Sequence, residues 1–405
     1  MNWKLAVTLV MVFVLVAIGV AGFRASRRPQ QFLVVVVDAL RADHVGCYGS
    51  TTVRTPNMDA LARRGLRYDA AYTQASWTAG ANAALFTGMY PGQVLLITPE
   101  GLPWLRPEAN TLAERFRAAG FATALFTSHP RITADFGFTQ GFGVTRYIFD
   151  NDRRVVRECA QWLQGHSARS FFAVVYLLGP HDPYTPKRPP ALPDGAPAEL
   201  ANGAFPNGKF GRKEITYLHS CYEGEIEDAD ADLGVLLADA PPRCTVALVS
   251  DHGEEWAEHG GLKHSRTLYD ECSHVPLILA GQRTGVIIAP VGTFQLAPTL
   301  LRLAGLTPNE MTAPPLPPYA PAPKAVFSTL AERMGYTNCP PFHQHAIRTA
   351  TDVGFRRADG TWEGATQLKP LMARHIAMNE ARGGRAQVRI SEQRARELRS
   401  LGYMR

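Results

Sequence analysis

The sequence lacks several patterns that would assign a function at once. Its six cysteines include no Cys-x-x-Cys pair, which excludes a zinc ribbon and a dithiol redox motif of that kind. It has no run of lysine and arginine and no nucleic-acid-binding motif, so its net charge of +6 favours an anionic substrate or an acidic surface over nucleic acid. Its 46% hydrophobic and 19% charged residues exclude wholesale disorder.

Charge is also absent from one stretch near the N-terminus, residues 5–23. Its 19 residues come close to the roughly 20 that cross a bilayer as a helix, and exceed the about 7 to 15 of a signal-peptide core. We therefore interpret residues 1–30 as an uncleaved transmembrane anchor, with a signal peptide and a buried core helix as the alternatives. Lys4 precedes the stretch and Arg24, Arg27 and Arg28 follow it, a distribution that by itself would keep the rest of the chain in the cytoplasm.

A run of apolar residues ends in a carboxylate at Asp38. Residues 33–37 are apolar and mostly β-branched, which is typical of a parallel strand buried on both faces. Ligands of open α/β sheets bind beyond the carboxyl ends of the strands, so Asp38 is a site candidate, although a helix N-cap is the simpler role. The pattern recurs where residues 246–250 run into Asp251 and His252. Two strands that end in metal-type ligands favour a metal site over two unrelated caps.

Alternating strand and helix patterns predict an α/β fold. Strands are expected at residues 121–126 and 170–178, and helices at residues 110–120 and 223–238. Residues 187–213 are rich in Pro, Gly and Ala and predict a long surface loop that could cover the site. We expect a catalytic domain at residues 31–311, followed at residues 312–405 by a proline-rich linker, residues 312–323, and a small C-terminal α+β subdomain.

Further polar side chains stand where predicted elements begin or end. Residues 75–88 begin with a hydroxyl-rich turn that places Ser76 or Thr78 at a helix N-terminus, a position that suits a cap and an anion site equally. His181 follows the strand at residues 170–178, and a polar loop carries Lys263 and His264. Taken alone, each histidine would be interpreted as a surface or structural residue.

Six short motifs follow one another along the chain. They are Asp38-Ala-Leu-Arg-Ala-Asp-His-Val-Gly-Cys-Tyr-Gly, Thr55-Pro-Asn-Met-Asp, Thr87-Gly-Met-Tyr-Pro, His181-Asp-Pro-Tyr, Ser250-Asp-His-Gly-Glu-Glu and Thr267-Leu-Tyr-Asp-Glu with Val275-Pro-Leu. These motifs resemble those of the sulfatase family in the alkaline-phosphatase superfamily. The resemblance extends from about residue 32 to residue 305, and residues 398–403 are similar to the usual ending of the family. The set is specific because chance would not place six such strings in this order.

The resemblance implies an α/β sandwich around a mixed, mostly parallel sheet, followed by a small subdomain with a short antiparallel sheet. It also implies one divalent metal ion, held by Asp38, Thr78, Asp251 and His252, with Thr78 as the nucleophile. The substrate would be an anionic sulfate or phosphate ester. Most relatives act outside the cytoplasm, which favours a periplasmic or extracellular catalytic domain on the N-terminal membrane anchor.

The resemblance gives three further residues a catalytic role. His181 and His264 fall where the family places groups that contact the transferred oxyanion or protonate the leaving group. Lys263 is a second candidate beside His264.

The chain departs from the family at its nucleophile and at two ligand positions. Common sulfatases read Cys or Ser, any residue, Pro, Ser and Arg, and convert the first of these to formylglycine, whereas this chain reads Thr78-Ala-Gly-Ala-Asn. Threonine cannot form that aldehyde, so we expect an unmodified hydroxyl nucleophile. Ala39 replaces the second Asp of the usual pair and His252 replaces an Asn. This exchange shifts the expected metal from Ca towards Mn or Zn, with Mg also open.

Three functions are compatible with these residues. The first is metal-dependent hydrolysis of a sulfate or phosphate ester through Thr78. The second is a phosphoglycerol- or phosphoethanolamine-type transferase, because a phosphothreonine can be hydrolysed or passed to an acceptor, whereas a sulfated threonine lacks the elimination route of formylglycine. The third is a degenerate sulfatase-like protein that binds without turnover, since Gly80, Ala81 and Asn82 replace the usual polar groups beside the nucleophile.

Overall fold

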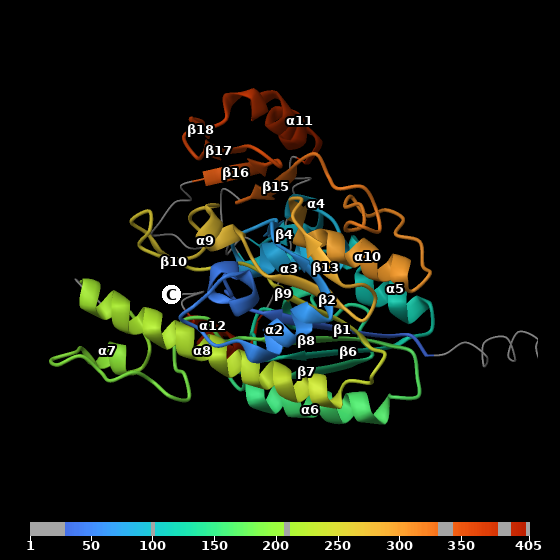
Figure 1. The fold of residues 1–405 in the computed structure, drawn as a ribbon, viewed down its shortest axis with the longest axis horizontal. Coiled ribbons are helices and arrows are strands. Elements are labelled where there is room, and N and C mark those ends of the chain that lie inside the picture. Colours follow the sequence, from blue (N-terminus) through green and yellow to red (C-terminus); the bar gives the residue numbers. More distant parts are fainter. Residues whose placement is uncertain (1–28, 99–101, 206–210, 331–342, 380–389, 402–405) are drawn as a thin grey trace, which may run out of the picture.

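The computed structural model describes residues 29–98, 102–205, 211–330, 343–379 and 390–401. Its centre is an eight-stranded sheet in the order β13-β2-β12-β9-β1-β8-β6-β7 (Figure 1). Neighbours from β9 to β7 run parallel, and β12 runs antiparallel to both β9 and β2. The predicted α/β fold with a mixed, mostly parallel sheet is confirmed. The strands are β1 (Gln31–Val37), β2 (Gly65–Tyr68), β6 (Ala122–Thr127), β7 (Val144–Tyr147), β8 (Phe171–Leu177), β9 (Thr245–Ser250), β12 (Leu277–Ala280) and β13 (Gly285–Ile287).

Strand β1 lies in the middle of this sheet and is buried along its whole length. Its β-branched residues pack on both faces, as the absence of alternation predicted. Val37 pairs with Leu177 of β8 on one side and with Ser250 of β9 on the other. Because these strands are parallel, Asp38 and Asp251 emerge side by side at the same edge of the sheet.

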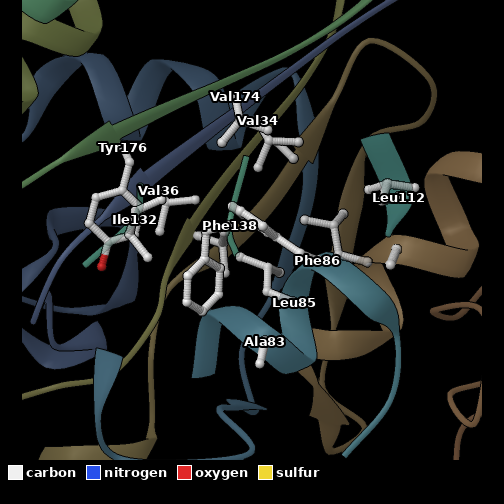
Figure 2. Close-up of a cluster of buried hydrophobic side chains, with 14 of the residues drawn as sticks. Val34, Val36, Ala83, Leu85, Phe86, Leu112, Ile132, Phe138, Val174 and Tyr176 are labelled. Carbon is white, nitrogen blue, oxygen red and sulfur yellow. The ribbon is translucent and has the colours of Figure 1, made fainter. Parts of the chain in front are cut away.

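Helices cover both faces of the sheet. Leu33 and Val35 of β1 face the layer formed by α2 (Pro56–Arg63), α6 (Asp152–Gly165) and α8 (Arg212–Asp239). Val34 and Val36 face the opposite layer, formed by α3 (Thr78–Thr87), α5 (Leu112–Ala118) and α10 (Leu296–Leu303). Figure 2 shows the second layer, in which Phe86 of α3 and Phe138 lie among the valines of β1. The sheet is therefore held rigidly from both sides.

The C-terminal part forms a second, four-stranded antiparallel sheet with the order β15-β16-β17-β18 (Figure 1). Its strands are β15 (Val326–Thr329), β16 (His343–Arg348), β17 (Val353–Arg357) and β18 (Trp362–Gly364), followed by α11 (Lys369–Asn379). The last helix, α12 (Glu392–Ser400), does not stay with this sheet. Tyr147 of β7 donates to Glu397 at 2.8 Å, and Arg394 pairs with Asp135 at 2.9 Å. The last helix thus packs against β7 and the turn that contains Asp135, beside the eight-stranded sheet.

The remaining elements are short. They are β3 (Ala71–Tyr72), α4 (Pro91–Val94), β4 (Leu95–Ile97), β5 (Pro103–Leu105), α7 (Ala198–Ala201), β10 (Glu255–Trp256), β11 (Leu262–Lys263), α9 (Asp270–Ser273) and β14 (Val291–Gly292). The 3-10 turns are Ala42–His44, Gly46–Tyr48, Pro107–Ala109, Ala134–Phe136, Thr293–Gln295 and Thr366–Leu368.

The structure changes the predicted bounds of one helix and one loop, and it does not describe the proposed membrane segment. The helix expected at residues 223–238 begins earlier, at Arg212, so it takes in the end of the predicted loop 187–213, which also contains α7. The proposed membrane segment at residues 5–23 lies outside the described residues. Among the described helices, none is long and apolar enough to span a bilayer. Cys47, Cys159, Cys221, Cys244 and Cys272 are free thiols.

Candidate active site

Two buried aspartates, Asp38 and Asp251, form the centre of the candidate site. The hydroxyl of Tyr176, near the end of β8, lies 3.0 Å from Asp38 Oδ2 and 2.6 Å from Asp251 Oδ2. One hydroxyl proton cannot satisfy both carboxylates at once. Burial, followed by the charge of Asp251, raises the pKa of Asp38 well above its usual range. The protein alone therefore does not fully compensate the negative charge of the two aspartates.

The surroundings of the two aspartates differ. Asp251 Oδ1 accepts from the backbone N–H groups of His252 at 2.8 Å and Ala39 at 3.3 Å, and its Oδ2 accepts from Asn82 Nδ2 at 3.0 Å. Ala39 reaches this position with a φ of 54°, a left-handed conformation that turns the chain sharply after β1. Asp38 Oδ1, in contrast, is buried without a hydrogen bond. A buried carboxylate oxygen of this kind calls for a compensating positive charge.

Thr78 is the first residue of α3 and is buried beside the aspartates. Its Oγ1 lies 3.3 Å from His252 Nε2. Asn82, one turn further along the helix, donates to the carbonyl oxygen of Thr78 at 2.8 Å as well as to Asp251. Ser76, the other hydroxyl left open by the sequence, donates to the carbonyl oxygen of Thr267 at 2.7 Å. Thr78, and not Ser76, is the hydroxyl that contacts His252, whose Nε2 in turn lies 3.4 Å from Asp38 Oδ1.

His252 presents a nitrogen lone pair to the same point. Its Nδ1 lies 3.0 Å from the carbonyl oxygen of Gly253, which can only accept, so Nδ1 carries a proton and donates it to that oxygen. The opposite nitrogen, Nε2, lies 3.4 Å from Asp38 Oδ1 and 3.6 Å from Asp251 Oδ2. Three electron-rich atoms that converge without a hydrogen between them fit a divalent cation. The residues predicted as ligands, Asp38, Thr78, Asp251 and His252, are thus brought together.

His129 adds a contact that the sequence analysis missed. It follows β6, and its Nδ1 accepts from the backbone N–H of Arg131 at 2.9 Å. Its Nε2 therefore carries a proton, which points at Asp38 Oδ2 at 3.3 Å. This arrangement makes His129 a hydrogen-bond donor to Asp38 and not a metal ligand, although Asp38, His129 and His181 lie within ligand distance of one another. Its place at the carboxyl end of a parallel strand was the available signal.

His181 and His264 extend this group of imidazoles. The ring centroid of His264 lies 4.1 Å from that of His252 and 5.1 Å from that of His181. His181 Nδ1 donates to the carbonyl oxygen of Asp182 at 2.6 Å, which leaves Nε2 as an acceptor. Burial is the main reason why the pKa values of His129, His181 and His264 lie well below the usual range. These rings are neutral near pH 7.

Glu254 contacts His264, and Lys263 contacts Asp182, the residue after His181. His264 Nδ1 lies 2.9 Å from Glu254 Oε1, and Tyr184 donates to Glu254 Oε2 at 2.9 Å. Burial raises the pKa of Glu254 to about 7. Lys263 donates to Asp182 Oδ2 at 2.8 Å, so its ammonium group is paired with the residue next to His181. Of the predicted catalytic residues, Lys263 is the one whose charge is compensated by a carboxylate.

The fold is shared with known ester hydrolases. A phosphonate monoester hydrolase from Silicibacter pomeroyi superimposes with a TM-score of 0.69 at 19% identity and covers 89% of this chain and 100% of its own. A 2-O GAG sulfatase gives 0.68 at 20% identity, with 91% of this chain and 96% of its own covered. These likenesses show that the chain has the fold of these two hydrolases over about nine-tenths of its length.

Sequence comparison narrows the class. The sulfatase family model matches residues 30–306, so the chain belongs to the sulfatase family of ester hydrolases. The uncharacterized sulfatase YidJ of Escherichia coli is 25% identical over 354 residues, or 70% of this chain and 69% of that protein. A Δ4,5-hexuronate-2-O-sulfatase of Bacteroides thetaiotaomicron is 25% identical over 342 residues, or 71% of this chain and 70% of that protein.

Proposed function

We propose that the chain is a metal-dependent hydrolase that cleaves a sulfate or phosphate ester through Thr78 as an unmodified nucleophile. The observation that carries the proposal is the position of Thr78 Oγ1. It lies at the start of α3 and 3.3 Å from His252 Nε2, beside the two buried aspartates. The unpaired N–H groups at the start of a helix favour negative charge, which suits an anionic ester and the oxyanion that develops on it.

The proposed metal ligands are Asp38, Asp251, His252 and Thr78. The hydrogen-bond-free oxygen of Asp38 and the lone pair of His252 Nε2 are the atoms that support this assignment. A mixed oxygen and imidazole set favours Mn or Zn, with Ca and Mg less suited. When bound, such an ion supplies Lewis-acid polarisation and neutralises the charge of the carboxylates.

The other residues of the site hold groups and move protons. Tyr176 and Asn82 fix the carboxylate of Asp251, and His129 donates to Asp38. Neutral imidazoles can accept a proton at Nε2 and pass it on, so His181 and His264 suit a shuttle from the attacking hydroxyl to the departing alcohol. Glu254 orients His264 through Nδ1, as a carboxylate orients the base of a catalytic triad.

The relatives and the chemistry of the nucleophile support different classes of ester. The hexuronate sulfatase supports a sulfated sugar as substrate. A threonine nucleophile favours a phosphate ester instead. A sulfated threonine cannot decompose by elimination as formylglycine does, whereas a phosphothreonine can be hydrolysed. A lipid head-group transferase would use the same first step and a different acceptor. We further propose a membrane anchor formed by residues 5–23, which the absence of charge in that stretch supports. We place the site outside the cytoplasm because most members of the resembled family act there, although the charges that flank the stretch alone favour the cytoplasm.

The test uses the purified full-length chain in detergent. It is assayed with Mn²⁺ against p-nitrophenyl sulfate, p-nitrophenyl phosphate, an aryl phosphodiester and a phenylphosphonate monoester. Thr78→Ala should lower kcat by at least about 10³-fold, as loss of a nucleophile does in other hydrolases. Ser76→Ala is the matched control and should keep activity within a few-fold.

Four outcomes decide between the alternatives. A phosphate or sulfate group on Thr78, trapped by acid quench and found by mass spectrometry, would establish the covalent step. Equal activity of Thr78→Ala and the native chain would rule out the nucleophile. Transfer of a labelled head group between lipids, with water as a poor acceptor, would identify a transferase. Metal or sulfated-ligand binding without turnover of any ester would identify a binding protein.

A further inference from the structure

A second group of ligand-type side chains lies outside the candidate active site. His44 belongs to the 3-10 turn after Asp38, and His219 and Glu223 belong to α8. The Nε2 atoms of His44 and His219 are 3.1 Å apart, and the ligand atoms of all three residues lie within 4.8 Å of one another. His219 and Glu223 are four residues apart on a helix, so they project from the same face. The chain thus presents two imidazoles and one carboxylate to a single point.

The orientation of the His44 ring favours metal binding. Its Nδ1 lies 2.9 Å from Asp43 Oδ1, so Nδ1–H donates to the carboxylate and Nε2 keeps its lone pair. Arg41 holds Asp43 with two hydrogen bonds, of 2.9 and 2.7 Å. A carboxylate on the far nitrogen is the usual partner of a metal-bound histidine, because it fixes the tautomer and the ring orientation.

The distances and charges also fit a cation. Two imidazole nitrogens at about 2.0–2.1 Å from a tetrahedral zinc ion are about 3.3 Å apart, close to the observed separation. The nearby carboxylates of Asp43, Glu223 and Glu258 outnumber the single guanidinium of Arg41.

We propose that His44, His219 and Glu223 bind one divalent transition-metal ion of the zinc type, separate from the ion at Asp38. Glu223 is partly exposed, and its Oε1 accepts from Thr52 at 2.9 Å, so it can turn towards the two rings at the cost of one surface hydrogen bond. A water molecule would complete four ligands.

The role of this ion is to fasten α8 to the turn that carries Asp38. Tyr222 of α8 already makes the same connection, because its hydroxyl donates to the carbonyl oxygen of Ala39 at 2.9 Å and accepts from the N–H of Arg41 at 3.1 Å. The rings of Tyr222 and Trp256 pack beside the two histidines, with centroids 5.4 Å from His44 and 5.1 Å from His219. The ion would therefore stabilise the fold without taking part in the reaction.

The test counts zinc ions on the full-length chain after removal of metal with a chelator and dialysis against Zn²⁺. If both centres bind zinc, the native chain holds two ions, His219→Gln holds one, Asp251→Asn holds one, and the double variant holds none. If the proposed function is wrong about the ion at Asp38, the native chain and Asp251→Asn each hold one, and His219→Gln holds none. The two proposals therefore fail separately.

One control variant tests whether the loss of any histidine changes the zinc count, and two further measurements test the proposed ligands. His166→Gln removes a partly buried histidine that pairs with the carbonyl oxygen of Trp162, and it should leave the zinc count unchanged. Glu223→Gln should weaken zinc binding at least about tenfold without disturbing the two rings. Cobalt in place of zinc should give a tetrahedral spectrum without thiolate charge transfer. An unchanged zinc count in folded His219→Gln would show that the pair is only a hydrogen-bonded pair of imidazoles and would overturn the proposal.

Discussion

Removal of one hydroxyl group, by Tyr176→Phe, tests the electrostatics of the site. The hydroxyl contacts both buried aspartates, at 3.0 and 2.6 Å. A neutral hydrogen bond contributes about 1 kcal/mol to stability, and one to a charged group about 1.5–3 kcal/mol. We therefore expect the free energy of unfolding of the metal-free chain to fall by about 2–3 kcal/mol.

The size of this loss should depend on metal. A divalent ion between Asp38 and Asp251 supplies the positive charge that the hydroxyl proton supplies in part, so the hydroxyl matters less when the ion is bound. We expect the loss to shrink to about 1 kcal/mol with saturating Mn²⁺. By linkage, Mn²⁺ should then raise the stability of Tyr176→Phe more than it raises that of the native chain.

The assay is urea unfolding in excess EDTA and in excess Mn²⁺, followed by fluorescence. Tyr68→Phe is the matched control, because Tyr68 is also fully buried but donates to a neutral acceptor, the carbonyl oxygen of Pro317, at 2.8 Å. It should cost about 1 kcal/mol under both conditions. Equal losses for the two variants in EDTA, or a loss for Tyr176→Phe that ignores Mn²⁺, would refute the reasoning.

Three further changes probe other parts of the chain. Burial lowers the pKa of His375 to about 4, so between about pH 6.5 and 4 the unfolded chain binds a proton that the folded chain does not, and the free energy of unfolding should fall by about 3 kcal/mol as the pH falls. His375→Phe, which keeps the stacking on Phe327, should remove this part of the pH dependence in urea unfolding. His264→Gln should lower kcat by about 10²–10⁴-fold for alkyl esters and much less for p-nitrophenyl esters, which leave without a proton; equal losses would contradict a role in protonating the leaving group. Gly141→Ala should destabilise the fold by about 2–4 kcal/mol, because φ is 83° and the new Cβ would lie 2.1 Å from a backbone nitrogen of α5, whereas Gly120→Ala, with φ of 88° and nothing within 4 Å, should cost about 1 kcal/mol in the same unfolding assay.

The sequence by itself determined the fold class and the ends of the two strands that define the site. Residues 33–37 and 246–250 are buried on both faces, so their composition alone marked them as central strands. Strands buried on both faces are typical of parallel sheets, and the carboxyl ends of parallel strands lie at the same edge. The sequence therefore placed Asp38 and Asp251 close together at that edge. The role of Thr78 was inferred only from the family resemblance. Its helix consists mainly of small and apolar residues and by itself looks like any buried helix.

The tertiary structure decided which other side chains meet these residues. Tyr176 looks like one more apolar residue of β8, and only the register beside β1 brings its hydroxyl to Asp38 and Asp251. Asn82, interpreted from the sequence as a lost polar group, donates to Asp251 because one helical turn separates it from Thr78. Such contacts join residues that are far apart in the chain, so no local pattern encodes them. The sequence gives each residue its chemistry and local conformation, and only the packing of distant elements fixes which polar atoms must neutralise one another.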